Sequence, residues 1–180
     1  YMNNALCHFL PEPFLPPNPP SAFLLIDAIC MAPPLAPCKA DSVRSFTDRF
    51  LTSHDRLDVL LANAGIMAVP YGKTDDGFEL QFGTNHLGHF VLVNRLLPLL
   101  KASAPSRIVN LSSAGHFASG IIWDDPNFET NDYSKMDAYG QSKTANILFT
   151  VELERRYGDA GVHALVDGWG WLREREGLVL

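Results

Sequence analysis

Tyr139 and Lys143 are the two residues of this chain whose types and spacing most clearly suggest chemistry. On a helix, positions i and i+4 share a face, so the lysine ammonium can lie beneath the tyrosine hydroxyl. A nearby cation favours the phenolate and lowers a phenol pKa that is otherwise near ~10. The pair can therefore donate or accept a proton near neutral pH. Taken alone, the same spacing also fits an ordinary solvated helix face, so the surrounding segments decide its meaning.

Three segments upstream of this pair place small or polar residues at the ends of predicted elements. Apolar residues 57–62 predict a buried strand that ends in a tight turn, and residues 107–111 predict a second strand that ends in a serine pair. A polar residue also lies near the start of a long apolar helix. The residues at these places are Asn63, Ala64, Gly65, Asn85, Ser112 and Ser113. Each of these residues is common in turns or helices and by itself does not indicate a function. Their occurrence together and in this order is what suggests a shared site.

These residues need elements that bring them together, and the hydrophobic pattern predicts strands and helices in alternation. Asp41 is a good N-cap for the first helix, and Gly161 ends the last one. The expected helices cover residues 41–53, 75–103 (one long helix or a broken pair) and 136–157, and the expected strands cover residues 23–29, 57–62, 107–111 and 162–166. An aromatic-rich loop is expected over residues 116–133. This alternation predicts an α/β fold with a doubly wound parallel sheet.

Glycine and proline divide the chain sharply. Nine of the 13 prolines fall between Pro11 and Pro37, whereas the first glycine is Gly65. The chain changes character again after the last predicted strand, where tryptophan and glycine are followed by charged residues. We therefore expect an irregular Pro-rich segment over residues 1–40, an ordered core over 41–166 and an atypical tail over 167–180.

Composition describes one soluble globular domain of 180 residues, with 47% hydrophobic and 19% charged residues. The net charge of -6 argues against nucleic acid or an anionic membrane as the main partner. Cys7, Cys30 and Cys38 are odd in number and lack C-x-x-C spacing, which favours a reducing compartment and argues against a zinc site. No apolar run reaches ~18 residues, so we expect no spanning helix. A cytoplasmic location is expected, with membrane association of a longer form left open.

Taken together and in this order, the segments closely resemble the short-chain dehydrogenase/reductase family over about residues 41–166. The run from Asn85 to His89 and the insert at residues 122–129 look most like the branch that contains retinol dehydrogenases and the WW-domain oxidoreductase. The resemblance implies a Rossmann-like core, truncated or altered at both ends, whose N-terminal strand–helix units are missing or replaced.

The resemblance also implies a role for each residue. Tyr139 would be the general acid in reduction and the base in oxidation, and Lys143 would lower its pKa and hold the cofactor ribose. Ser113, rather than Ser112, would hydrogen-bond the substrate oxygen. Asn85 would bend its helix and hold a water linked to the lysine. The turn that would back the adenine ribose is Asn63, Ala64 and Gly65. The implied cofactor is NADP or NAD, with NADP preferred by analogy. The resemblance also implies a homodimer as a possible assembly.

Two functions from different classes follow. The first is an NAD(P)-dependent oxidoreductase that interconverts an alcohol and a carbonyl by hydride transfer, with the apolar residues between Ser113 and Tyr139 as the wall for a lipophilic substrate. The second is a catalytically dead remnant that serves as a binding or dimerisation module. The family's glycine-rich phosphate turn requires glycines that this chain lacks before Gly65, and its adenine-binding acid aligns with Ala36. Asp167 also stands where a Pro-Gly turn would seat the nicotinamide.

Two other chemistries fit single features of the sequence. His86 and His89 could suggest a metal pair, but histidines at i and i+3 without a third ligand more often pack within a helix, and no metal is expected. Ser113 with His116 hints at a hydrolase, although no G-x-S-x-G elbow surrounds the serine.

Overall fold

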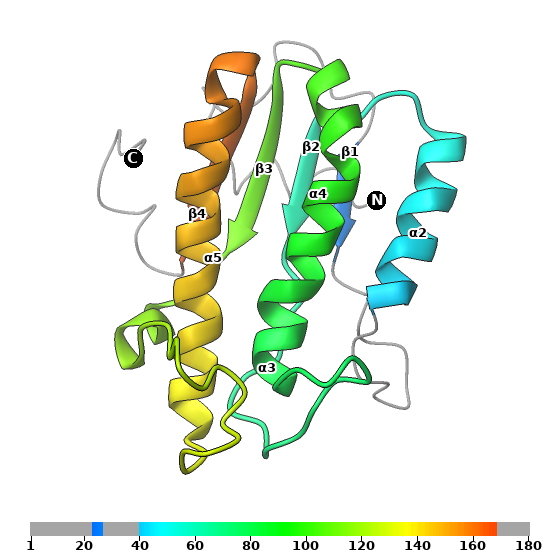
Figure 1. Cartoon of the computed structure of the whole chain (residues 1–180). Coiled ribbons are helices and arrows are strands. Elements are labelled where there is room, and N and C mark those ends of the chain that lie inside the picture. Colours follow the sequence, from blue (N-terminus) through cyan, green and yellow to red (C-terminus); the bar gives the residue numbers. More distant parts are fainter. Residues whose placement is uncertain (1–22, 27–39, 169–180) are drawn as a thin grey trace, which may run out of the picture.

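The structure, a computed structural model, describes residues 23–26 and 40–168. Its strands form one parallel sheet in the order β1-β2-β3-β4 (Figure 1). The strands are β1 (Phe23–Ile26), β2 (Val59–Ala62), β3 (Ser106–Leu111) and β4 (Val162–Asp167). The α/β class and the parallel sheet predicted from the sequence are confirmed. The predicted strand over residues 23–29 is found over 23–26, and the rest of it lies outside the described residues.

Three long helices lie on one face of the sheet: α2 (Ala40–Ser53), α4 (Gly88–Ala102) and α5 (Lys135–Tyr157) (Figure 1). Parallel crossovers are right-handed, so strands added in one direction place every connecting helix on the same side. A doubly wound sheet covers its second face where the strand order reverses. The described residues contain one half of that arrangement.

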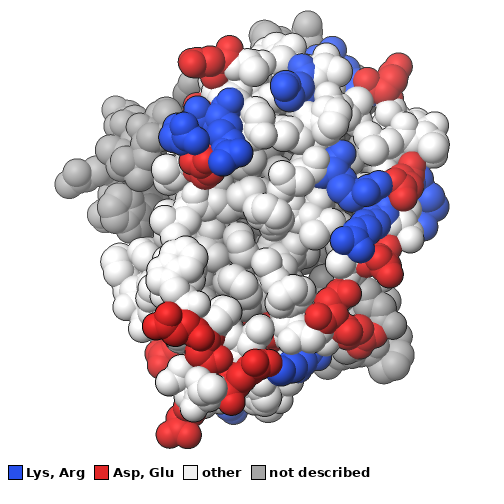
Figure 2. Space-filling view, viewed as in Figure 1, with Lys and Arg blue, Asp and Glu red and all other residues white. Residues whose placement is uncertain are grey.

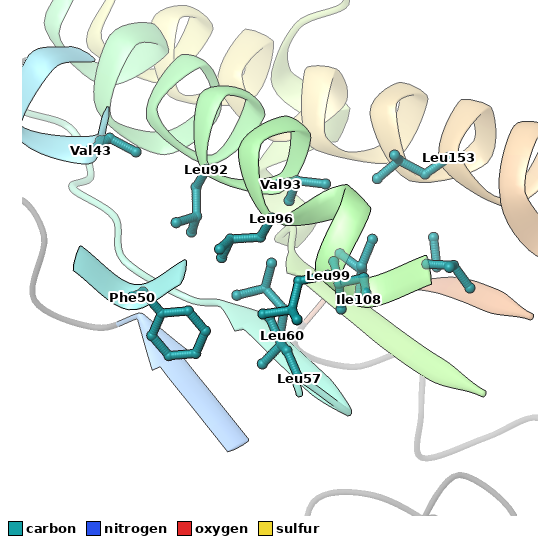
Figure 3. Close-up of a cluster of buried hydrophobic side chains, with 13 residues drawn as sticks. Val43, Phe50, Leu57, Leu60, Leu92, Val93, Leu96, Leu99, Ile108 and Leu153 are labelled. Carbon is teal, nitrogen blue, oxygen red and sulfur yellow. The ribbon is translucent and has the colours of Figure 1, made fainter. Parts of the chain in front are cut away.

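The core lies between this helical layer and the sheet (Figure 3). Leu60 and Ile108 point from β2 and β3 toward Leu92, Leu96 and other apolar side chains of α4, and all four are at most 1% exposed. Phe50 of α2 and Leu153 of α5 close the two ends of the cluster. Three of the four residues of β2 are buried and Leu61 is partly buried, and the strand is a continuous apolar run, as expected of a parallel strand with neighbours on both sides.

The segment predicted as one helix or a broken pair over residues 75–103 starts later than expected. It consists of α3 (Leu80–Phe82), a π turn η2 (Gly83–Leu87) and α4. Residues 75–79 are not helical, because Gly77 adopts φ 87° in a turn and Glu79 acts as the N-cap. The Glu79 carboxylate accepts hydrogen bonds from the amides of Gln81 (2.9 Å) and Phe82 (2.7 Å).

The other elements lie close to their predicted bounds. Ser134 caps α5 through the amide of Asp137, and Gly161 ends the region after the short helix η4 (Gly158–Ala160) with φ 78°. The segment predicted as a loop over 116–133 begins inside a 3₁₀ helix, η3 (Ala114–Ala118), which Ser113 caps. In the described ranges, no helix is long and apolar enough to cross a membrane.

Several sequence expectations fall on residues 1–22, 27–39 and 169–180, which lie outside the described residues. They include the irregular Pro-rich segment, most of the tail, the three cysteines and the acid position at Ala36. The predicted division into residues 1–40, 41–166 and 167–180 therefore stays a prediction.

Leu96→Ala tests the core. Because Leu96 is fully buried against β2 and β3, we expect the free energy of unfolding to fall by ~2–5 kcal/mol in urea titrations followed by circular dichroism. Leu148→Ala on α5 is the control, since that side chain is 49% exposed and its removal should cost less than about 0.5 kcal/mol. Equal losses in both variants would contradict the assignment of the core.

Candidate active site

The predicted polar residues meet where the strands end. The carboxyl ends of parallel strands lie at one edge of a sheet, and β2, β3 and β4 are followed there by Asn63, Ser112 and Gly168. Helix α5 packs along β3 and β4, and its first half passes this edge (Figure 1). The fold thus collects residues from distant parts of the sequence on one side of α5.

Lys143 is held against the end of β3. Its ammonium Nζ donates to the carbonyl oxygen of Leu111 at 3.0 Å, and the side chain is buried. Burial disfavours the charged form and lowers the pKa of Lys143 to about 8. Among the described residues no carboxylate forms an ion pair with it. A Cβ placed on Gly65 would lie 3.7 Å from Nζ, so the turn after β2 closes over the lysine.

Tyr139 lies one turn before Lys143 on the same face of α5. Its ring centre is 5.6 Å from Nζ, and the side chain is 8% exposed. Gly115 packs on the other side of the ring, where an added Cβ would approach the ring carbon Cε1 to 2.5 Å. That distance is too short for any other residue, so glycine is required if the ring is to keep its place. Sequence reasoning did not single out Gly115, although a glycine two residues after the candidate serine was a visible signal.

The two serines differ in what they bond. Ser112 donates its hydroxyl to the backbone carbonyl of Lys143 at 3.0 Å and so ties β3 to α5. Ser113 accepts a hydrogen bond from the amide of Gly115 at 3.1 Å, and its hydroxyl proton has no acceptor in the described part of the chain. Ser113, Gly115 and the Tyr139 ring thus form a continuous wall, with Ser113 as the serine that has a proton to give.

Asn85 lies in the middle of the π turn, and the bend predicted for its helix stays a prediction. Its side-chain oxygen accepts from the amide of Ile66 (2.8 Å), and its side-chain nitrogen donates to the carbonyl of Ile66 and to Ser142 (both 2.9 Å). Its own backbone carbonyl accepts from His89 (2.9 Å) and Asn146 (3.1 Å). The predicted water-holding role would compete with these protein donors and stays a prediction.

The histidines are engaged in packing contacts. Burial lowers the pKa of His89 to about 4, and its Nδ1 bonds the Asn85 carbonyl. His86 contacts the side-chain oxygen of Asn146, and burial lowers its pKa as well. His116 bonds the backbone carbonyl of Ser113 through Nδ1 and not the serine hydroxyl. Within residues 40–168, no three His, Cys, Asp or Glu side chains gather in a way that could hold a metal ion.

The loop between Ser113 and Tyr139 is fastened to the helix that carries the tyrosine. Gln141 accepts from the amide of Ile122 (2.9 Å) and donates to the carbonyl of Pro126 (3.0 Å). Inside the loop, burial raises the pKa of Asp125, but hydrogen bonds from residues 129–131 outweigh it and hold that pKa below its ordinary range. Two aromatic side chains of the loop region, Phe117 (74%) and Trp123 (79%), remain exposed.

Comparison with known proteins places the chain in a family. A family profile described as short chain dehydrogenase matches residues 31–125, which is more than half of the chain. This chain belongs to the short-chain dehydrogenase family. The resemblance predicted from its motifs is thereby confirmed.

Among curated relatives, human retinol dehydrogenase 13 is 54% identical over 121 residues, which cover 67% of this chain and 37% of the relative. Human retinol dehydrogenase 14 is 58% identical over 115 residues, covering 64% and 34%. A short-chain dehydrogenase/reductase from Penicillium roqueforti, prx1, is 49% identical and covered to 38%. The chain therefore spans little more than a third of the length of these relatives.

Two solved structures show the same fold. An uncharacterised protein from Mycobacterium paratuberculosis is 47% identical with a TM-score of 0.66, over 74% of this chain and 47% of that one. The RhlG protein of Pseudomonas aeruginosa, solved as an active-site complex with NADP, is 25% identical with a TM-score of 0.53, over 71% and 48%. Each match supports the parallel sheet and its helical layer.

Short-chain dehydrogenases use a nicotinamide cofactor. The regions of this chain that would face its nicotinamide ribose and its diphosphate differ in how well they fit those groups. At the reaction end, a buried ammonium, a phenol and a glycine turn lie together, which fits a nicotinamide ribose. At the diphosphate end, no glycine precedes Gly65. Helix α2 begins at Ala40, whose amide donates to the Asp76 carboxylate (2.8 Å), and it carries Asp41 in its first turn. Acidic side chains also gather at the lower end of the molecule in Figure 2. The nicotinamide end fits and the diphosphate end does not.

The buried lysine predicts a pH dependence of stability. Because the pKa of Lys143 falls from 10.5 to about 8 on folding, the unfolded chain binds the proton more tightly. Stability relative to Lys143→Met should therefore rise with pH between about 8 and 10.5, by up to ~1.4 kcal/mol per pH unit, and stay constant between pH 6 and 7.5. Urea titrations across this range measure the difference.

Lys135→Met removes an exposed lysine from the same helix and is the matched control. A difference curve for Lys143→Met that runs parallel to the curve for Lys135→Met would contradict burial of the Lys143 ammonium.

Proposed function

We propose that this chain carries the reaction centre of an NAD(P)-dependent oxidoreductase that interconverts an alcohol and a carbonyl. The observation that carries the proposal is the placement of a phenol and a buried ammonium on one face of α5, with the Ser113 segment against the same ring. Relatives named retinol dehydrogenases support this class of reaction.

The role proposed for each residue follows from the hydroxyl or ammonium group that it carries. Ser113 donates a hydrogen bond to the substrate oxygen and orients it beside the Tyr139 hydroxyl. Tyr139 gives its proton to that oxygen during reduction and takes it back during oxidation. Lys143, with a pKa of about 8, is largely cationic at neutral pH and favours the phenolate. Lys143, Tyr139 and the turn at Asn63, Ala64 and Gly65 would hold the ribose of a nicotinamide cofactor, which would supply the hydride chemistry when bound.

The substrate in this proposal is a small lipophilic alcohol or carbonyl compound. The exposed rings of Phe117 and Trp123 belong to the segment between the serine and the tyrosine, and they would offer apolar surface to such a substrate. Phe128 belongs to the interior of the loop, since it is 7% exposed and packs edge-on against Tyr133. The wall would therefore be built from Ile121, Ile122 and the two exposed rings.

NADP is the proposed cofactor because a family member that is 25% identical was solved as a complex with NADP. NAD is the alternative, since the residues that distinguish the two cofactors lie outside the recognisable segments. The location proposed for the protein is cytoplasmic, with membrane association of a longer form left open.

A second candidate, a binding or dimerisation module without catalysis, is favoured by the outer face of the helical layer. Phe90 of α4 (44%) and Leu148 and Val151 of α5 (49% and 42%) are exposed apolar side chains. Figure 2 shows charged residues around the edge of this view and uncharged surface in its middle. Such a surface suits a second copy of the chain and does not suit nucleic acid.

Calorimetry separates the two candidates. If the chain is an enzyme, NADPH or NADH should bind the purified protein with a Kd below about 1 mM, and Lys143→Met should weaken binding about tenfold. Lys101→Met is the control, because that lysine lies beside Tyr157 at the far end of α5. An absence of binding up to millimolar cofactor would favour the module.

Tyr139→Phe tests the proton-transfer step. If the chain turns over an alcohol with NADP, the variant should lose ~10²–10⁴-fold in kcat while the cofactor Kd stays within about twofold. Tyr157→Phe changes a tyrosine at the other end of α5 and should keep the wild-type rate. A Tyr139→Phe variant with near-wild-type kcat would refute the assignment of Tyr139 as proton donor.

A further inference from the structure

Asn146 lies one turn beyond Lys143 on α5 and is 1% exposed. Its side-chain nitrogen donates to two backbone carbonyls, that of Leu111 at 2.9 Å and that of Asn85 at 3.1 Å. Its side-chain oxygen meets Nδ1 of His86 at 3.0 Å. A single buried amide thus joins the end of β3 and the π turn to the helix that carries the lysine.

The orientation of this amide follows from its partners. Two carbonyl oxygens can only accept, so the NH₂ group must face them and both its protons are used. The side-chain oxygen then faces His86, whose Nδ1 must carry the proton. Burial lowers the pKa of His86 and so favours the neutral ring. A neutral imidazole carries one proton, and the contact with the Asn146 oxygen requires that this proton is on Nδ1.

The carbonyl of Leu111 is shared. It accepts from Nζ of Lys143 at 3.0 Å and from the Asn146 amide at 2.9 Å, and a carbonyl oxygen has two lone pairs. We propose that Asn146 is a positioning residue that fixes the Lys143 ammonium by occupying the second acceptor site of the Leu111 carbonyl while it anchors the Asn85 carbonyl of the π turn. The value of this placement for catalysis rests on the proposed function, whereas the hydrogen bonds do not.

The proposal explains why the lysine can keep one place without a carboxylate partner. With one acceptor site left, the ammonium has one direction in which to donate to Leu111. The titratable groups with an interaction to it in the described chain are Tyr139 on its own helix and His89 from α4. Neither of them is a carboxylate, so the hydrogen bond to Leu111 holds the ammonium in place.

A titration of the wild-type protein by NMR tests the proposal, with one variant used only to assign the lysine signal. The chain has five lysines, so labelling with ε-¹³C lysine gives few signals, and the signal that Lys143→Met removes is that of Lys143. The side-chain amide protons of Asn146 should shift with the same midpoint as Lys143, near pH 8, since both share one carbonyl. Amide protons of Asn146 that stay constant while Lys143 titrates would overturn the proposal.

The variant Asn146→Leu tests in which direction Asn146 changes the pKa of Lys143. Asn146→Leu keeps a similar volume and removes both donors, which leaves the Leu111 carbonyl to the ammonium alone. A stronger hydrogen bond favours the charged form, so the pKa of Lys143 should rise by ~0.5–1 unit. Ser106→Ala is the matched control, because it deletes a fully buried hydrogen bond to Leu100 (2.8 Å) at the other end of β3.

An unchanged Lys143 titration in folded Asn146→Leu would reduce Asn146 to a structural residue. Neither measurement requires cofactor or turnover. A chain without oxidoreductase activity could therefore still pass this test, and an active enzyme could fail it.

Discussion

The burial of the Lys143 ammonium against one carbonyl of β3 is the constraint on which the rest of the site depends. Removing a cation from water is costly, and here the compensation in the described chain comes from hydrogen bonding rather than from an ion pair. The neighbours of the lysine are arranged accordingly: Ser112 ties its backbone to β3, Gly65 closes over it and Asn146 shares its acceptor. These contacts are all made within the protein and fix the lysine where a preorganised site would need it.

Close backbone approach is the second requirement, and glycines meet it. A Cβ on Gly115 would strike the Tyr139 ring, and a Cβ on Gly140 would come within 2.7 Å of the Gly115 carbonyl. The two glycines therefore let the turn after β3 lie directly on α5. Since Tyr139 and Lys143 both lie on α5, a small displacement of that helix would move both of them away from Ser113.

Sequence reasoning could predict the parts of the structure that local pattern controls. The parallel sheet, α2 and α5 followed from apolar periodicity and caps, and Tyr139, Lys143, Asn85 and Ser113 followed from motifs. The late start of α3 did not, because a carboxylate cap at Glu79 and a glycine turn outweighed helix propensity in residues 75–79. Asn146 was also missed, since an asparagine inside an amphipathic helix has no local signal for two carbonyls that come from other elements.

The π turn, β3 and α5 form a preassembled site, and this can be measured by the hydrogen exchange of one amide. Ile66 lies outside any helix or strand, and its amide is held by the side chain of Asn85 at 2.8 Å. In the ligand-free protein we predict exchange as slow as that of Leu60 in the core strand β2, while the exposed loop amide of Gly120 exchanges freely. Exchange of Ile66 as fast as that of Gly120 would contradict the claim.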